Sequence, residues 1–156
     1  MRIVDCLELS GEEQARAREA IRHAGWRGAQ HLYALLMENR LREQCGASTR
    51  LLLGMEGDAL AAFCTLAERD DVDAPLMPWI GYVYTFPAFR SQRRCGALIE
   101  RACDLARREG FERVYLSTRE VGLYEKYGFA FMRSMKDSRG DDTRVYCRNV
   151  SGKPSP

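Results

Sequence analysis

The chain has 156 residues, 46% of them hydrophobic and 29% charged, and a formal net charge of +2. This size and composition predict one globular domain that buries about two thirds of its unfolded surface. The small net charge argues against a general coat for nucleic acid. No apolar run approaches the roughly 18 residues of a membrane span, and the start lacks the apolar core of a signal peptide. We therefore expect a cytoplasmic protein with neither nucleic acid nor membrane as a partner.

The cysteines and acidic residues form no metal-binding pattern. The six cysteines are scattered, without a CxxC pair or a Cys/His spacing typical of zinc. We expect reduced and mostly buried thiols. The acidic run of Asp70, Asp71 and Asp73 is better explained as a solvated loop than as a cation site. The sequence thus predicts no metal.

In the first half of the chain, the pattern predicts a strand, two helices and a hairpin. Ser10 and Glu13 have the spacing of a capping box, which marks the start of the first helix. Glu56-Gly57-Asp58 divides two apolar runs with the chemistry of a hairpin turn. The expected elements are a strand at Arg2 to Leu9, a helix ending near His23, a second helix from about Ala29 to Gln44, and strands at Leu51 to Met55 and Leu60 to Leu66.

The second half is dominated by one long amphipathic helix. Its apolar residues, from Cys95 to Ala106, recur at offsets of three, four and seven, which gives one buried face. Ser91 is the expected N-cap and Gly110 the expected stop. The other expected elements are strands at Ile80 to Phe86, Val114 to Leu116, Phe129 to Met135 and Thr143 to Cys147, and a helical turn ending at Gly128.

Together these elements predict a mixed α/β sheet with the long helix packed on one face. We expect a single domain over residues 1–150 and a flexible tail over 151–156. Arg90, Arg93 and Arg94 surround the opening of the long helix. Exposed backbone N–H groups and the positive end of the helix dipole also lie there. This opening is therefore a predicted anion site.

Two segments of the chain resemble the GNAT acyltransferase superfamily. The first runs Tyr84-Thr85-Phe86-Pro87-Ala88-Phe89-Arg90 and continues through the basic turn into the long helix. The second is Leu123-Tyr124-Glu125-Lys126-Tyr127-Gly128-Phe129. The resemblance implies a GNAT-like α/β fold, with a mixed, mostly antiparallel central sheet of about six to seven strands flanked by about four helices.

The same resemblance implies an acetyl-CoA-dependent N-acetyltransferase. Acetyl-CoA would be the co-substrate, and a primary amine of a small molecule or peptide would attack its thioester directly. In this family the strand–turn–helix cradles the pyrophosphate, and the strand before the turn donates a backbone N–H to the thioester carbonyl. Tyr124 is the implied proton donor to the leaving thiolate, and Ser117 takes the place of an asparagine that contacts the pantetheine arm in many relatives. The implied cofactor-binding residues are Val83, Tyr84, Thr85, Phe86, Arg90, Ser91, Gln92, Arg93, Arg94, Cys95, Gly96, Ala97, Ser117 and Tyr124.

The chain departs from the family pattern at two places. The family's Arg/Gln-x-x-Gly-x-Gly/Ala turn corresponds to Arg90 to Cys95, with Arg93 and Cys95 in place of the small residues. Glycine matters there only where φ is positive or where a ligand comes too close for a Cβ. The strand glutamate that relatives often carry is missing, because Trp79 to Tyr82 contain no carboxylate.

These departures leave the general base and the class of function open. The general base is either absent, replaced by water, or supplied by Glu38, Glu68 or Asp5. A non-catalytic acyl-CoA-binding regulatory module of the same fold is the alternative function, and an Arg-rich nucleic-acid module is a third, disfavoured by interspersed acids. We expect the Trp26 region and the Asp137–Asp142 hairpin to bound the acceptor, and the acidic hairpin favours a cationic amine. A homodimer is compatible with the resemblance.

Overall fold

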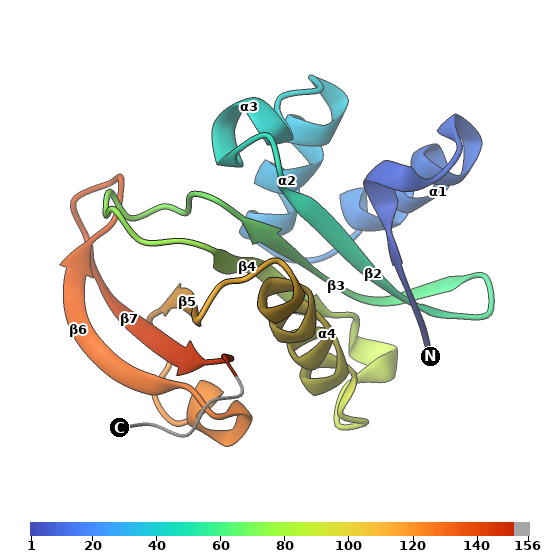
Figure 1. Ribbon diagram of the computed structural model, residues 1–156. Helices are drawn as coiled ribbons and strands as arrows, with labels where there is room; N and C mark the ends of the chain where they lie inside the picture. Colours follow the sequence, from blue (N-terminus) through green and yellow to red (C-terminus); the bar gives the residue numbers. More distant parts are fainter. Residues whose placement is uncertain (152–156) are drawn as a thin grey trace.

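The computed structural model describes residues 1–151, which form a seven-stranded sheet with helices on both faces (Figure 1). The strands are β1 (Arg2–Asp5), β2 (Arg50–Glu56), β3 (Ala59–Ala67), β4 (Trp79–Thr85), β5 (Arg113–Thr118), β6 (Ala130–Lys136) and β7 (Asp142–Asn149). The helices are α1 (Gly11–Arg22), α2 (Arg27–Met37), α3 (Leu41–Cys45) and α4 (Arg94–Arg108), with short 3-10 turns η1 (Cys6–Glu8), η2 (Pro87–Phe89) and η3 (Tyr124–Tyr127). Of the tail expected at 151–156, residues 152–156 lie outside the described part of the chain.

The sheet order is β1-β2-β3-β4-β5-β7-β6. Only β4 and β5 are parallel among the neighbouring strand pairs of the described chain, and they are joined through α4. This arrangement confirms the predicted mixed, mostly antiparallel sheet and the strand–helix–strand unit at its centre. A parallel pair needs such a crossover, and the helix that makes it packs back on the sheet.

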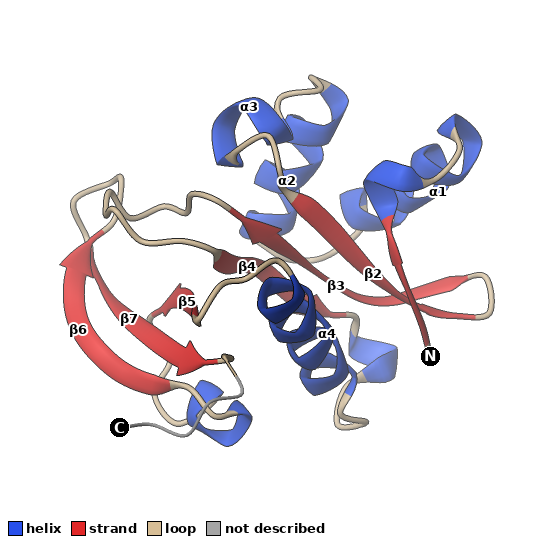
Figure 2. Cartoon of the chain, viewed as in Figure 1, coloured by secondary structure: helices blue, strands red, loops and turns tan. Residues whose placement is uncertain are grey.

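The alternation of side chains along β2 and β3 builds a core on each face of the sheet. Leu52, Cys64 and Leu66 pack with α4 on one face, whereas Leu53 and Phe63 pack with α1, α2 and α3 on the other. Figure 2 shows the three N-terminal helices on one side of the central strands and α4 on the other. Because both faces are covered, these strands are apolar almost without interruption.

Several element boundaries differ from the sequence prediction. The first strand ends at Asp5, where the carboxylate accepts the amide of Leu7 and starts η1. The second predicted helix is two helices, broken around Asn39, which has a φ of 55°. Ser10 is the N-cap of α1, as its spacing predicted: its hydroxyl accepts the Glu13 amide at 3.2 Å and donates to the Glu13 carboxylate at 3.0 Å.

Candidate active site

A bulge in β4 opens the sheet at its centre. Two residues of β4, Tyr82 and Val83, lie opposite the single residue Cys64 of β3, and Tyr82 has a φ of 49°. Beyond this point β4 no longer follows β5, whose pairing with β4 is Trp79 opposite Tyr115. The splayed strands therefore leave main-chain groups of β4 facing an open space rather than a neighbouring strand.

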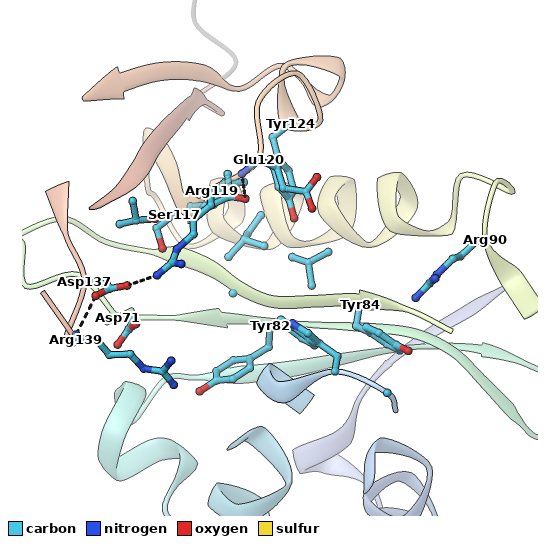
Figure 3. Close-up of a pocket in the computed structure, with 18 residues that line it drawn as sticks. Asp71, Tyr82, Tyr84, Arg90, Ser117, Arg119, Glu120, Tyr124, Asp137 and Arg139 are labelled. Carbon is cyan, nitrogen blue, oxygen red and sulfur yellow. Dashed lines mark hydrogen bonds and ion pairs between the residues drawn. The ribbon is translucent and has the colours of Figure 1, made fainter. Parts of the chain in front are cut away.

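This space is a cleft of about 670 Å³ (Figure 3). Its walls include the divergent parts of β4 and β5, and it extends from Arg90 at one end to the hairpin between β6 and β7 at the other. Of the residues implied to bind the cofactor, five line the cleft: Val83, Tyr84, Arg90, Ser117 and Tyr124. Thr85, Phe86 and residues 91 to 97 do not line it, and their role in binding stays a prediction.

Tyr124 projects into the cleft from η3 (Figure 3). Its ring is only 9% exposed and packs edge-on against Phe129 and Tyr127. Burial, followed by nearby acidic groups that include Glu120, raises the pKa of the Tyr124 phenol well above its usual value. The side chain therefore stays protonated at neutral pH and holds a hydrogen that it can donate into the cleft.

The turn before α4 contains two residues in the left-handed region, Ser91 with a φ of 65° and Arg93 with a φ of 60°. The helix begins at Arg94 with Arg93 as its N-cap, so the prediction of Ser91 as the N-cap is wrong. Arg93 stands where the family pattern has its first glycine. The positive φ explains the glycine of the pattern, because glycine adopts this conformation without steric cost. The amide N–H groups of residues 91 to 96 donate no hydrogen bond to other residues within 1–151. They form a set of free donors at the start of a helix.

The second departure from the family pattern, Cys95, does not face this set of donors. Cys95 packs against the core under α4, and burial raises the pKa of its thiol to about 11. Gly96 is needed for the same packing, because a Cβ there would lie 2.8 Å from Cε1 of Tyr127. Small side chains at these two positions therefore serve the contact between α4 and η3.

The three arginines of the turn have different surroundings. Arg94 is 15% exposed, and its guanidinium binds Glu56 of β2 at 2.9 Å. Arg90 is exposed, donates from Nε to the Thr85 carbonyl at 3.0 Å, and lies 5.6 Å from the centroid of the Tyr84 ring. Arg93 is also exposed. Arg90 and Arg93 thus present charge to solvent, whereas Arg94 ties the helix to the sheet.

The model of the Acetyltransferase (GNAT) family matches residues 13–129. The chain belongs to the GNAT family of acetyltransferases. The predicted GNAT-like fold is confirmed by solved structures that cover nearly the whole chain. A search of curated proteins found no significant match.

Three solved structures illustrate this similarity of fold. Aminoglycoside 6'-acetyltransferase type Ii has 13% identity and a TM-score of 0.75, with 100% of both chains covered. Aminoglycoside 6'-N-acetyltransferase complexed with coenzyme A has 9% identity and a TM-score of 0.69, covering 99% of this chain and 100% of that one. The ribosomal-protein-S18-alanine N-acetyltransferase from Escherichia coli has 16% identity and a TM-score of 0.67, covering 99% and 96%. At these identities the likeness establishes the fold alone.

The far end of the cleft in this GNAT chain is built from the segments expected to bound the acceptor. Trp26 stacks on Tyr84 with ring centroids 5.7 Å apart, and the hairpin contributes Asp137 and Arg139. The acidity of the hairpin is neutralised within the protein, because Arg119 lies 3.2 Å from both Asp137 and Asp141. Asp142 is likewise paired with Lys136, at 2.6 Å. The hairpin therefore gives no excess negative charge to select a cationic amine.

A smaller pocket of about 290 Å³ adjoins this end of the cleft and shares Gly81, Tyr82 and Ser117 with it. His31 of α2 also lines the pocket, and its Nδ1 lies 2.9 Å from the Tyr82 hydroxyl. No signal in the sequence links this histidine to β4, since the contact depends on how α2 lies over the bulge.

None of the three carboxylates considered from the sequence as a base lines the cleft or the adjoining pocket. Asp5 accepts backbone amides at the start of η1, Glu68 accepts the amide of Ser48, and Glu38 pairs with Arg40 at the surface. Asp70, interpreted from the sequence as part of a solvated loop, instead lines the adjoining pocket and is half-buried.

Within residues 1–151, no helix is long and apolar enough to cross a membrane.

Proposed function

We propose that this chain is an acetyl-CoA-dependent N-acetyltransferase that moves the acetyl group to a primary amine of a small molecule or peptide. The observation that carries the proposal is the cleft at the splay of β4 and β5. It has the phenol of Tyr124 on one wall and the free amides of residues 91 to 96 beyond Arg90. Membership of an acetyltransferase family and the fold shared with a coenzyme A complex support the choice of cofactor.

The turn of residues 90 to 96 would hold the diphosphate of the cofactor. Free amides at a helix start and the positive dipole end attract anions, and the exposed Arg90 and Arg93 add charge-assisted contacts. The pantetheine arm and thioester would follow the β4 main chain from Phe86 back to Val83. A backbone N–H at the bulge then polarises the thioester carbonyl, where negative charge develops during attack.

Over the reaction, the acceptor's ammonium group loses two protons and the leaving thiolate gains one. An aliphatic amine with a pKa near 10.4 has to lose a proton, which costs about 4 to 5 kcal/mol at pH 7. The nitrogen lone pair then attacks the thioester carbonyl carbon, so that a C–N bond forms and the C–S bond breaks. The second amine proton leaves to water as the amide forms. The thiolate takes a proton from the Tyr124 phenol, and the resulting phenolate regains a proton from water.

Tyr124 is a weaker acid than a thiol, by about 2 kcal/mol at ordinary pKa values, and burial widens the difference. The same desolvation acts on the departing thiolate and makes it a stronger base. Donation from Tyr124 to sulfur is therefore helped wherever the bound cofactor keeps water away from the departing thiolate. Without full proton transfer, a hydrogen bond from the phenol to the sulfur also lowers the barrier to C–S cleavage, because it stabilises the negative charge that develops on the sulfur.

The regulatory alternative, binding of acyl-CoA without transfer, is motivated by Arg93 and Cys95 in the turn. A test that separates it has two stages. Titration calorimetry with coenzyme A and with acetyl-CoA comes first, and we expect uptake of both with micromolar affinity. Thiol release from acetyl-CoA is then measured over a panel of aliphatic amines, short peptides with a free α-amine and an aminoglycoside. Uptake without thiol release from any amine supports the regulatory module, and absence of uptake excludes both functions.

A further inference from the structure

The side chain of Asp70 folds back from the loop after β3 onto β4. A Cβ built on Gly81 would lie 2.9 Å from Oδ1 of Asp70 and 3.1 Å from the hydroxyl of Thr65. Separations below 3.0 Å essentially do not occur for real Cβ atoms, so any side chain at this position of β4 would require the Asp70 carboxylate to move. The carboxylate thus occupies the space that a side chain at position 81 would take.

Asp70 also reaches across the splay to β5. The Ser117 hydroxyl donates to its Oδ2 at 2.7 Å, a contact between residues 47 positions apart in the chain. Burial raises the pKa of the Asp70 carboxyl above its usual value, opposed by hydrogen bonds from Ser117 and from the backbone of Asp71. A carboxylate held in this way is a stronger base than one in water, and it remains ionised only at the expense of desolvation.

The pocket beside the cleft gives Asp70 access to an acceptor. Asp70 lines it together with Gly81 and Ser117, which also line the main cleft, so the carboxylate lies next to the point where the strands part. The titratable and charged groups that face it are Arg69 and Asp71 of its own loop, Cys45 of α3, His31 of α2, Tyr82 of β4 and Arg139 of the hairpin. Arg69 and Arg139 balance the charges of Asp70 and Asp71, so the pocket is close to neutral, and its hydroxyl and carboxylate oxygens can accept hydrogen bonds from an amine.

We propose that Asp70 is the catalytic base, and that its carboxylate accepts the first proton of the acceptor amine from the pocket beside Gly81 and Ser117. The assignment rests on the proposed acetyltransferase function. The ammonium group gives one proton to Asp70, which passes it to water in the open cleft, and the free nitrogen attacks the thioester. Ser117 is a positioning residue, because it holds Oδ2 and leaves Oδ1 beside Gly81.

Other carboxylates near the cleft are less suited to this role. Asp71 is exposed, unlike the half-buried Asp70, and Asp137 is paired with Arg119. Glu120 is exposed, and its charge is one of the causes that raise the pKa of Tyr124. Glu120 therefore lies near the proposed position of the leaving sulfur, away from the acceptor. An exposed carboxylate retains most of its hydration and is a weak base.

The kinetic test compares Asp70→Asn with wild type, with two acceptors that differ in basicity. Nα-acetyl-lysine offers an amine with a pKa near 10.4, and a short alanine peptide offers one near 8. We expect Asp70→Asn to lower kcat at pH 7 by about 100-fold with the first and less with the second, because less deprotonation is needed. The acid limb of the wild-type pH–rate profile is expected to disappear. Asp73→Asn, an exposed residue of the same loop, is the matched control, with wild-type rates.

Gly81→Ala tests the seating of the carboxylate, because its Cβ displaces Oδ1 without removing the charge. We expect a loss of kcat close to that of Asp70→Asn, with coenzyme A uptake retained in both variants. A wild-type rate in Asp70→Asn would overturn the assignment. So would a pH–rate profile that loses its acid limb in Glu120→Gln but keeps it in Asp70→Asn. Absence of coenzyme A uptake by the wild-type protein would instead overturn the proposed function itself.

A measurement independent of any acceptor completes the test. Carbon-detected NMR follows the Asp70 carboxyl through a pH titration of the coenzyme A complex, with Asp70→Asn giving the resonance assignment. We expect a midpoint above the ordinary aspartate value near 3.9. A midpoint at or below that value would contradict the role of Asp70 as a base, whatever the acceptor turns out to be.

Discussion

The two ends of the cleft are built from different parts of the polypeptide. At the turn end, the lining residues Val83, Tyr84 and Arg90 lead into the turn of residues 91 to 96, and the useful groups of this one continuous segment are mainly backbone amides. The acceptor end brings together side chains of Trp26, Asp70, Ser117 and Arg139, which come from four separate segments. A site made of backbone tolerates a change of side chain, whereas a site made of side chains depends on each residue and on how the segments pack.

This difference explains why we expect the departures from the family turn to leave the proposed anion site intact. Arg93 adopts the left-handed conformation that the family's glycine would adopt, so the direction of the following amides is preserved. At the acceptor end, by contrast, the absence of a carboxylate on β4 is matched by Asp70 in the space above Gly81. One end keeps its geometry despite a substitution, and at the other we propose that a carboxylate from a different segment takes the place of the missing one.

The largest effect on activity is expected where the two ends meet, at Tyr124. Tyr124→Phe removes the proton donor but keeps the packing against Phe129, so we expect kcat to fall about 100-fold while the affinity for coenzyme A stays nearly the same. Steady-state kinetics and calorimetry measure the two quantities. Tyr127→Phe is the control, because that ring packs against Gly96. Equal losses of turnover and affinity in Tyr124→Phe would make the residue structural.

A smaller effect is expected from the charge at the turn end. Arg90→Ala removes an exposed guanidinium that is already oriented by the Thr85 carbonyl. We expect the Kd for coenzyme A to rise about tenfold, the equivalent of one charge-assisted hydrogen bond, with the difference shrinking as salt is added. Calorimetry at two ionic strengths measures both. Arg101→Ala, an exposed arginine farther along α4, should leave Kd unchanged, and an equal effect of both variants would point to non-specific attraction.

The sequence predicted the turn end and the scaffold better than the acceptor end. The spacing of apolar residues locates α4, and the segment around Tyr124 has a recognisable order of residues. The bulge could not be predicted, because a positive φ at Tyr82 has no compositional signal, unlike the same conformation at glycine. The break between α2 and α3 did have one, since asparagine tolerates the left-handed region and Asn39 lies there.

The role proposed for Asp70 was not predictable from the local pattern. An acidic run in a polar loop has the composition of a solvated segment, and Asp71 and Asp73 are indeed exposed. What distinguishes Asp70 is its contact with Ser117, which depends on the fold bringing two distant segments together. The only hint within the sequence is Gly81 itself, a glycine inside a strand, which often marks the close approach of another group.

At Arg93, we expect the strained backbone conformation to lower stability and the charged side chain to favour coenzyme A binding. Arg93→Gly relieves the left-handed conformation, so we expect the free energy of unfolding to rise by about 1 kcal/mol. The amides keep their direction, so the loss of coenzyme A affinity should be smaller than in Arg90→Ala. Urea unfolding and calorimetry measure the two quantities. A fall in stability would indicate that the Arg93 side chain, and not the backbone, fixes the turn.

The smallest effect, and the most direct check on the acceptor end, is the influence of Asp70 on stability. Because burial raises its pKa, the folded state binds more protons than the unfolded chain between the two pKa values, and stability falls as pH rises through that interval. Asn in place of Asp70 keeps an acceptor for the Ser117 hydroxyl but removes the desolvated charge. Asp70→Asn should therefore raise the midpoint of urea unfolding at pH 7, and the gain over wild type should diminish toward about pH 4. Asp73→Asn should show no such trend. A variant that gains stability while it loses turnover identifies a group retained for chemistry, whereas a variant destabilised at pH 7 would mean that the carboxylate serves to hold β4 and β5 together.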